Sequence, residues 1–138
     1  MPALTLPASL EQLATVNEYL RHRTPPAYAA ILPRLQLAAE EILVNVCTYA
    51  YAGKTGQAEV DCRLERHDGQ EMLCLGIKDW GPPFDPFTDA PTPDLDLGVD
   101  ERPVGGLGIH LITTMAARHA YTRQDGANVV KLCFTAPE

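Results

Sequence analysis

The sequence has few of the features that mark membrane and secreted proteins. Its longest uninterrupted apolar run is far shorter than the roughly 20 residues that a transmembrane helix needs. The first ten residues also lack the basic start of a signal peptide. We therefore expect no membrane association and a cytoplasmic location.

Positive charge is scarce and dispersed. The chain has 11 Lys and Arg residues against 18 Asp and Glu residues, which gives a formal net charge of −7 at pH 7. Because the basic residues are scattered along the chain, the electrostatic footprint of a nucleic-acid-binding protein is missing. We expect no direct nucleic-acid partner.

The four cysteines form no Cys-x-x-Cys pair, which zinc sites and thioredoxin-type redox motifs normally contain. They stand far apart, at Cys47, Cys62, Cys74 and Cys133. We predict that they are small apolar side chains buried in the core.

Several other catalytic motifs are absent. The sequence contains no Gly-x-Ser-x-Gly and no His-Glu-x-x-His segment, which argues against serine hydrolases and zinc proteases. The segment Gly53-Lys54-Thr55 resembles the end of a P-loop, but Thr48 occupies the place of the leading glycine. We therefore do not predict a P-loop.

The composition is that of one folded domain. Of 138 residues, 46% are hydrophobic and 21% are charged, close to the averages of soluble domains. A chain of this length can bury roughly two-thirds of its unfolded surface without disulfides or metals. We expect a single domain over residues 1–138.

The hydrophobic pattern predicts helices that alternate with hairpins. Apolar residues three and four apart indicate helices, period-two alternation indicates strands, and Asp-Gly pairs indicate tight turns. The predicted elements are a strand at 3–6, a helix at 9–23, a helix at 35–50, strands at 60–64 and 72–78, a helix at 105–118, and strands at 119–123 and 127–135.

This order lacks the strict strand and helix alternation of a parallel doubly wound sheet. We predict an α/β (α+β) two-layer sandwich, in which a mixed, largely antiparallel sheet carries its helices on one face. Residues 81–103 are rich in Pro, Asp and Gly, and a loop of that length inside a compact domain is usually functional.

Three groups of residues carry chemistry, and the first lies on the helix predicted at 35–50. Glu41, Asn45 and Tyr49 are four residues apart and therefore project from one side of a helix. An Asn carbonyl oxygen suits magnesium, and a carboxylate one turn earlier can accept a proton. A polar stripe on a surface helix is the alternative interpretation.

The second group follows the strand predicted at 72–78. An ionised Asp79 only accepts hydrogen bonds, so it can bind the exocyclic amine of adenine, and Gly81 would let the ring approach the backbone. The alternative interpretation of 79–86 is a Pro-rich turn.

The third group is the glycine cluster Gly105-Gly106-Leu107-Gly108, which precedes a helical pattern. The N–H groups and dipole of a helix N-terminus suit a phosphate group. A role in close packing explains the glycines equally well.

Taken in order, 41–45, 79–86 and 105–108 resemble the N, G1 and G2 boxes of the gyrase and histidine-kinase ATPase (GHKL) superfamily. The resemblance covers roughly residues 35–134 and is closest to stand-alone anti-sigma-factor serine kinases. The sequence departs from the pattern at Pro83, where the G1 box usually has glycine, and at Tyr49, where the N box often has histidine.

The resemblance implies a histidine-kinase-type ATPase fold that binds ATP and Mg2+ under a lid at about residues 87–104. It implies Glu41 as general base and Asn45 as magnesium ligand. The implied cofactor-binding residues are Asn45, Asp79, Gly81, Phe84, Arg102, Gly105, Gly106, Leu107 and Gly108.

The resemblance also implies a serine/threonine protein kinase that phosphorylates an anti-anti-sigma (STAS-type) partner and controls a sigma factor, as a homodimer. Two alternatives stay open. One is a non-catalytic binding module in which ATP selects a protein partner, and the other is a histidine-kinase-like ATPase domain that works without its phosphoacceptor domain.

Overall fold

The computed structural model describes residues 3–89 and 106–137. In chain order the elements are β1 (Leu4–Pro7), η1 (Leu10–Gln12), α1 (Leu13–Arg23), η2 (Pro26–Ile31), α2 (Leu32–Asn45), η3 (Val46–Ala50), β2 (Gln57–His67), β3 (Gln70–Asp79), α3 (Gly106–Met115), β4 (Arg118–Gln124) and β5 (Ala127–Phe134). The predicted sequence of elements is confirmed.

Within these residues, five strands form one sheet in the order β1-β2-β3-β5-β4, and every neighbouring pair is antiparallel. Both predicted hairpins turn at Asp-Gly pairs. Asp68 and Gly69 have φ values of 54° and 80°, and Asp125 and Gly126 have 52° and 79°. Positive φ at both central residues gives the turn a twist that matches that of the strands.

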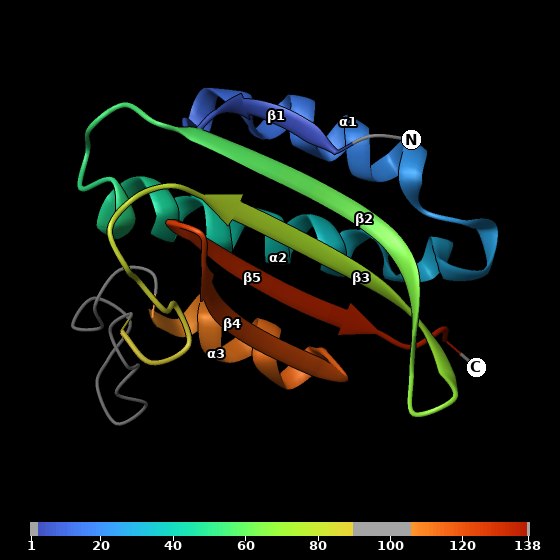
Figure 1. The fold of residues 1–138 in the computed structure, drawn as a ribbon. Coiled ribbons are helices and arrows are strands. Elements are labelled where there is room, and N and C mark those ends of the chain that lie inside the picture. The colour runs from blue at the N-terminus through green and yellow to red at the C-terminus, as the bar shows by residue number, and fades with distance from the viewer. Residues whose placement is uncertain (1–2, 90–105, 138) are drawn as a thin grey trace.

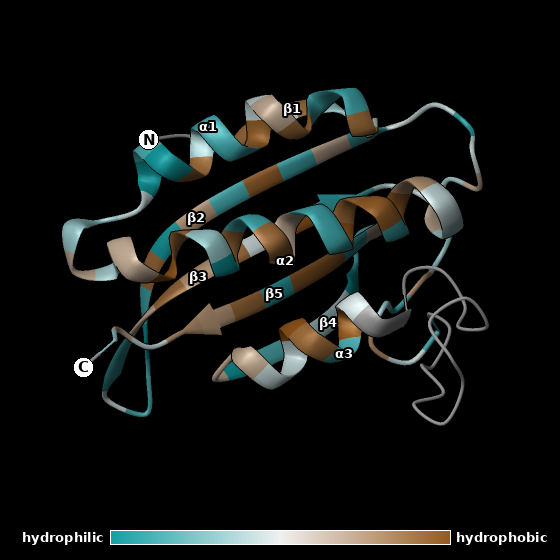
Figure 2. Ribbon diagram, turned by 180° about the vertical axis from the view of Figure 1, so that it is seen from behind, coloured by the Kyte–Doolittle hydropathy of each residue, from teal (hydrophilic) through white to brown (hydrophobic). Residues whose placement is uncertain are grey.

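The helices α1, α2 and α3 cover one face of the sheet, and none of the described helices lies on the other face, which we call the open face (Figures 1 and 2). The core lies between the two layers because α2 turns Leu35, Ala39 and Ile42 toward apolar residues of the strands, such as Leu75 and Leu132. The predicted α+β sandwich with helices on one face is confirmed.

The second predicted helix is not uniform. The α-helix α2 ends at Asn45, and Val46–Ala50 continues as one π-helical turn, η3. A π-turn inserts an extra residue into the helical ladder and often occurs at functional sites. The regular four-residue spacing that we expected from Glu41 to Tyr49 therefore holds only as far as Asn45.

The prediction that the four cysteines are only small apolar side chains buried in the core is wrong for Cys74 and Cys133, which are bonded to each other, and for Cys47, which is only partly buried. A disulfide joins Cys74 of β3 to Cys133 of β5, whereas Cys47 and Cys62 are free thiols. The two strands pair with Cys74 directly opposite Cys133, at a Cα–Cα distance of 4.1 Å. The two cysteines are 59 residues apart in the chain, so the local spacing of residues cannot predict that they lie opposite each other.

Part of the predicted lid lies outside the described residues, as do Arg102 and Gly105. Of that segment, 87–89 are described, and Phe87 packs against the core. No helix within the described residues is long and apolar enough to span a membrane.

Two adjacent residues of α3 test the packing of this helix. Ile112 is fully buried, whereas Leu111 is 45% exposed. Truncating a buried isoleucine to alanine removes apolar contacts and leaves a cavity, so Ile112→Ala should lower the free energy of unfolding by about 2–5 kcal/mol. Urea denaturation measures the change.

Leu111→Ala is the matched control and should change the free energy of unfolding by no more than about 0.5 kcal/mol. Equal losses in the two variants would contradict the helical register described for α3.

Candidate functional site

The residues of all three motifs gather at one end of the molecule. There the end of α2, the end of β3, the start of α3 and the start of β5 lie close together, at the left of Figure 1. The sequence brings these ends together because β3 and β5 run antiparallel, while α2 packs beside both β3 and α3.

Asp79 is the last residue of β3, and its side chain is only 2% exposed. Its Oδ1 accepts hydrogen bonds from the Gly81 backbone N–H at 3.0 Å and from Asn128 Nδ2 at 2.9 Å. Burial raises the pKa of Asp79, while these two donors and Arg123 act in the opposite direction. The described partners engage Oδ1, and the carboxylate can accept a further hydrogen bond from a ligand.

Asn128 is a residue of the candidate site that the sequence analysis missed. It is fully buried on β5, directly opposite Asp79 in the strand register. Its Nδ2 also donates to the Pro82 carbonyl at 2.9 Å, and its Oδ1 accepts from the Tyr121 hydroxyl at 2.6 Å and the Phe84 N–H at 3.1 Å. One amide thus fixes the carboxylate and the loop that follows β3.

A polar residue at an inward position of β5 is the signal that could have found Asn128. Val130 and Leu132, which point to the same side of the strand, are buried and apolar. An asparagine in that series needs partners, since burying an amide without hydrogen bonds costs free energy.

Gly81 lies where the loop after β3 passes η3. A Cβ atom placed on Gly81 would come within 2.9 Å of the Ala50 carbonyl oxygen, closer than real Cβ atoms approach. The Gly81 carbonyl also accepts a hydrogen bond from Arg123 at 2.7 Å. The absence of a side chain therefore lets the G1-like segment pack directly on the end of the helix that carries Asn45.

Asn45, at the end of α2, is 1% exposed. Its Nδ2 donates to the Glu41 carbonyl at 2.7 Å. Its Oδ1 is buried and has no hydrogen-bond partner among residues 3–89 and 106–137. Since a buried acceptor without a partner is costly, this oxygen is suited to a ligand or a cation.

Glu41 lies one turn before Asn45, where α2 meets α3. Burial raises the pKa of Glu41, and the nearby charge of Glu40 acts in the same direction. A Cβ atom on Gly108 would overlap the Glu41 carboxylate, so only glycine lets α3 approach this side chain. A carboxylate with a raised pKa beside the start of a helix is suited to accept a proton.

The π-turn carries the Tyr49 ring onto the loop after β3. The rings of Tyr49 and Phe84 stack with centroids 5.2 Å apart and an interplanar angle of 18°. Phe84, predicted to bind cofactor, thus contacts Tyr49 and belongs to the segment that Asn128 holds. The Tyr51 hydroxyl also accepts from the Trp80 N–H at 3.0 Å, a second link between these segments.

The structure thus brings the predicted residues into two adjoining groups. Asp79, Gly81 and Phe84 surround Asn128, whereas Glu41, Asn45 and Gly108 meet between α2 and α3. The close contact of Gly81 with η3 connects them. Gly106 and Leu107 are the first residues of α3, and Arg102 and Gly105 lie outside the described residues.

Comparison with known proteins agrees with the fold. A protein-family model described as histidine kinase-like ATPase domain matches residues 6–134. The chain is also 32% identical over 106 residues to a protein of Bordetella bronchiseptica named serine/threonine-protein kinase BtrW. That alignment covers 75% of this chain and 71% of the relative.

Asn128→Ala tests the role of the buried amide. The substitution removes the donors to Asp79 and Pro82 and the acceptor for Tyr121 and Phe84. Leaving buried polar groups unpaired should lower the free energy of unfolding by about 1–3 kcal/mol. Chemical denaturation followed by circular dichroism measures the change.

Asn17 of α1 is only partly buried and provides the control, because Asn17→Ala should cause no loss of stability. Wild-type stability of Asn128→Ala would contradict the description of Asn128 as the residue that holds Asp79.

Proposed function

Because this chain belongs to the histidine kinase-like ATPase family, we propose that it is an ATP-dependent protein serine/threonine kinase of an anti-sigma system. Its substrate is a serine on an anti-anti-sigma, STAS-type partner. When it does not act on this partner, it sequesters a sigma factor. The name of the Bordetella relative supports the kinase class.

The adenine base binds at Asp79. The family implies ATP binding, and the buried carboxylate at the end of β3 accepts a hydrogen bond from the exocyclic amine of adenine. Asn128 and the Gly81 N–H hold the carboxylate in a fixed orientation, so little ordering is needed when the base arrives. Gly81 lets the ring lie against the backbone.

The triphosphate extends from there toward α2 and α3. The backbone N–H groups at the start of α3 stabilise a negatively charged phosphate. They belong to Gly106, Leu107 and Gly108. The net charge of −7 repels a polyanion, so the attraction has to be local. In the same proposal, Arg102, Gly105 and a lid at residues 87–104 complete the enclosure of the nucleotide.

Asn45 fits the role of magnesium ligand. Its Oδ1 is buried without a partner in the described part of the chain, and amide oxygens are suitable ligands for this hard cation. Bound magnesium would neutralise charge on the phosphates as the γ-phosphoryl group is transferred. The hydrogen bond from Asn45 Nδ2 to the Glu41 carbonyl occupies the nitrogen side of the amide and fixes its orientation.

Glu41 serves as the general base. As the partner's serine oxygen attacks the γ-phosphorus, a Glu41 carboxylate oxygen accepts the hydroxyl proton and ADP leaves with the electrons of the broken P–O bond. Burial raises the pKa of Glu41 above its ordinary value, which strengthens the carboxylate as a base. The proton then passes to solvent.

One observation carries the proposal. A carboxylate with a raised pKa, an unpaired buried amide oxygen and the glycine-lined start of a helix meet within one turn of α2. A packing role explains glycines, but it does not explain an acceptor buried without a partner. The proposed kinase is a homodimer.

Transfer of radiolabelled γ-phosphate from ATP to candidate STAS-type partners tests the kinase activity. Glu41→Gln should reduce the transfer rate by about 100-fold or more, because general-base catalysis contributes that much. The same variant should keep its magnesium-dependent thermal stabilisation, about 2.7 kcal/mol at 100 times the dissociation constant of ATP. Asp79→Asn should lose that stabilisation.

Glu40 is the matched control, since it is exposed and adjacent, and Glu40→Gln should reduce the transfer rate far less than Glu41→Gln does. Intact ATP binding with no transfer to any partner would favour a nucleotide-gated binding module. An acid-labile product would instead indicate phosphohistidine chemistry. Either outcome would overturn the serine kinase proposal.

A further inference from the structure

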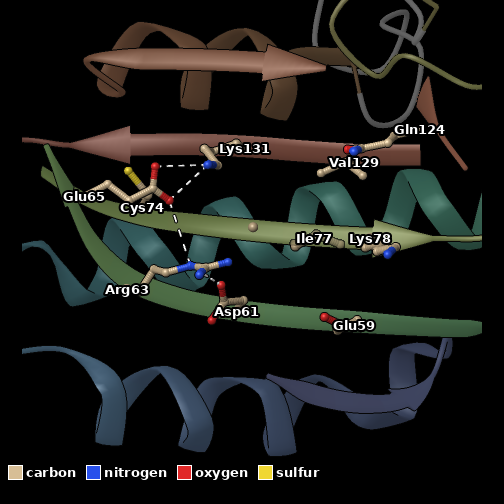
Figure 3. Close-up of a pocket in the computed structure, with 11 residues that line it drawn as sticks. Glu59, Asp61, Arg63, Glu65, Cys74, Ile77, Lys78, Gln124, Val129 and Lys131 are labelled. Carbon is tan, nitrogen blue, oxygen red and sulfur yellow. Dashed lines mark hydrogen bonds and ion pairs between the residues drawn. The ribbon is translucent and has the colours of Figure 1, made fainter. Parts of the chain in front are cut away.

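The open face of the sheet carries a cluster of metal-binding side chains that the proposed kinase chemistry does not use. Cys74 and Cys133 are buried, and His67 and Glu65 lie beside them with 23% and 20% of their side chains exposed. Figure 3 shows Glu65, Cys74 and Lys131 close together on this face. We refer to Glu65, His67, Cys74 and Cys133 as the thiol cluster.

The four side chains converge on a common point. Their potential ligand atoms all lie within 4.8 Å of one another. His67 Nε2 is 3.9 Å from each of the two sulfur atoms and 3.0 Å from Glu65 Oε1. Three adjacent strands, β2, β3 and β5, supply them, so the sheet ladder holds the donor atoms in place.

These donors match the ligand preferences of zinc. Zinc binds Cys sulfur at about 2.3 Å and His nitrogen or carboxylate oxygen at about 2.0–2.2 Å, with four ligands in a tetrahedron. Such bond lengths place neighbouring ligand atoms roughly 3.3–3.8 Å apart. The sulfur-to-nitrogen and nitrogen-to-oxygen distances in the thiol cluster lie within a few tenths of an ångström of that range.

The surroundings favour anionic ligands. Lys131 Nζ is 3.0 Å from the Glu65 carboxylate, and Arg63 Nε is 4.0 Å from it. Lys131 also orients the carboxylate, as groups around a metal ligand commonly do.

Solvent reaches the cluster from two sides. A hollow of about 110 Å³ is lined by His67, Arg118 and Cys133, among others. A second hollow of about 250 Å³ is lined by Glu65, Cys74 and Lys131, among others. A metal ion therefore has a path to the donor atoms without any opening of the core.

The thiol cluster is separate from the candidate nucleotide site. Cys74 is five residues before Asp79 on β3, and Cys133 is five residues after Asn128 on β5. At about 3.4 Å per residue, the two pairs lie roughly 17 Å apart along the same two strands. Their side chains also project to opposite faces of the sheet, because five is an odd number.

We propose that the reduced thiol cluster binds one zinc ion through Cys74, Cys133, His67 and Glu65, and that oxidation to the Cys74–Cys133 disulfide abolishes this binding. The structure shows the oxidised state of the pair, in which the two sulfur atoms are bonded to each other. The two thiolates of the reduced state are the zinc-binding state, since a disulfide sulfur carries no thiolate charge.

The redox step balances with a peroxide as the oxidant. One thiolate attacks hydrogen peroxide to give a sulfenic acid and hydroxide, and the second thiolate displaces hydroxide from that sulfur to form the disulfide. Two electrons pass from the sulfur atoms to the peroxide, whose O–O bond breaks. When zinc is bound before oxidation, disulfide formation releases the ion to solvent.

Zinc content of the reduced and oxidised protein tests the proposal. Protein reduced with a phosphine, loaded with Zn2+ and desalted should retain one zinc per chain, and peroxide-treated protein should retain none. Cobalt in place of zinc should show the visible bands of tetrahedral coordination and a sulfur-to-cobalt charge-transfer band. Thiol titration in parallel reports the oxidation state.

Variants identify the ligands. Cys74→Ser and Cys133→Ser should lose zinc. His67→Gln removes a ligand and should weaken zinc affinity by at least about 100-fold. Loss of a residue that only hydrogen-bonds to a metal ligand already costs about 10–100-fold. The matched control is Cys47→Ala/Cys62→Ala, which removes the two free thiols and should still bind one zinc. Circular dichroism checks that each variant is folded.

Three results would overturn the proposal. The first is reduced, folded wild-type protein that retains no zinc. The second is zinc retention by Cys74→Ser equal to that of the wild type. The third is equal zinc content in the reduced and the peroxide-treated protein.

Discussion

The hydrogen bond between Asp79 and Asn128 is the interaction on which the candidate site depends. It joins the end of β3 to the start of β5, away from solvent, where an unpaired carboxylate would be costly. Through the same amide, the loop after β3 is attached to the sheet at Pro82 and Phe84. The carboxylate that we propose to bind adenine is thereby held in place by the folded chain.

The other half of the site depends on how closely two helices approach. Gly108 lets α3 lie against Glu41, and the α-helical ladder of α2 ends at Asn45, where the π-turn begins. The outcome is a buried oxygen with no partner in the described residues and a carboxylate with a raised pKa. Both features cost stability, as expected where a fold retains a functional site.

Much of the fold could be predicted because its signals are local. Asp68-Gly69 and Asp125-Gly126 indicate tight turns, and the period-two pattern of β2 indicates a strand with one apolar face. The sequence could not reveal Asn128 or the Cys74–Cys133 bond in the same way. Each depends on the register between β3 and β5, which is set by packing of the whole sheet. The order of the motifs predicted Glu41, Asn45 and Asp79 as candidates, but only the folded chain shows which of their atoms lack partners.

The central claim is that Asp79, Asn45 and the start of α3 bind one nucleotide together. A crystal structure with Mg2+ and a non-hydrolysable ATP analogue tests it most directly. The account predicts that the Asp79 carboxylate accepts a hydrogen bond from the adenine amine, that Asn45 Oδ1 ligates magnesium, and that the phosphates face the N–H groups of α3. A nucleotide bound elsewhere, with Asp79 and Asn45 both free of contact with it, would contradict the account.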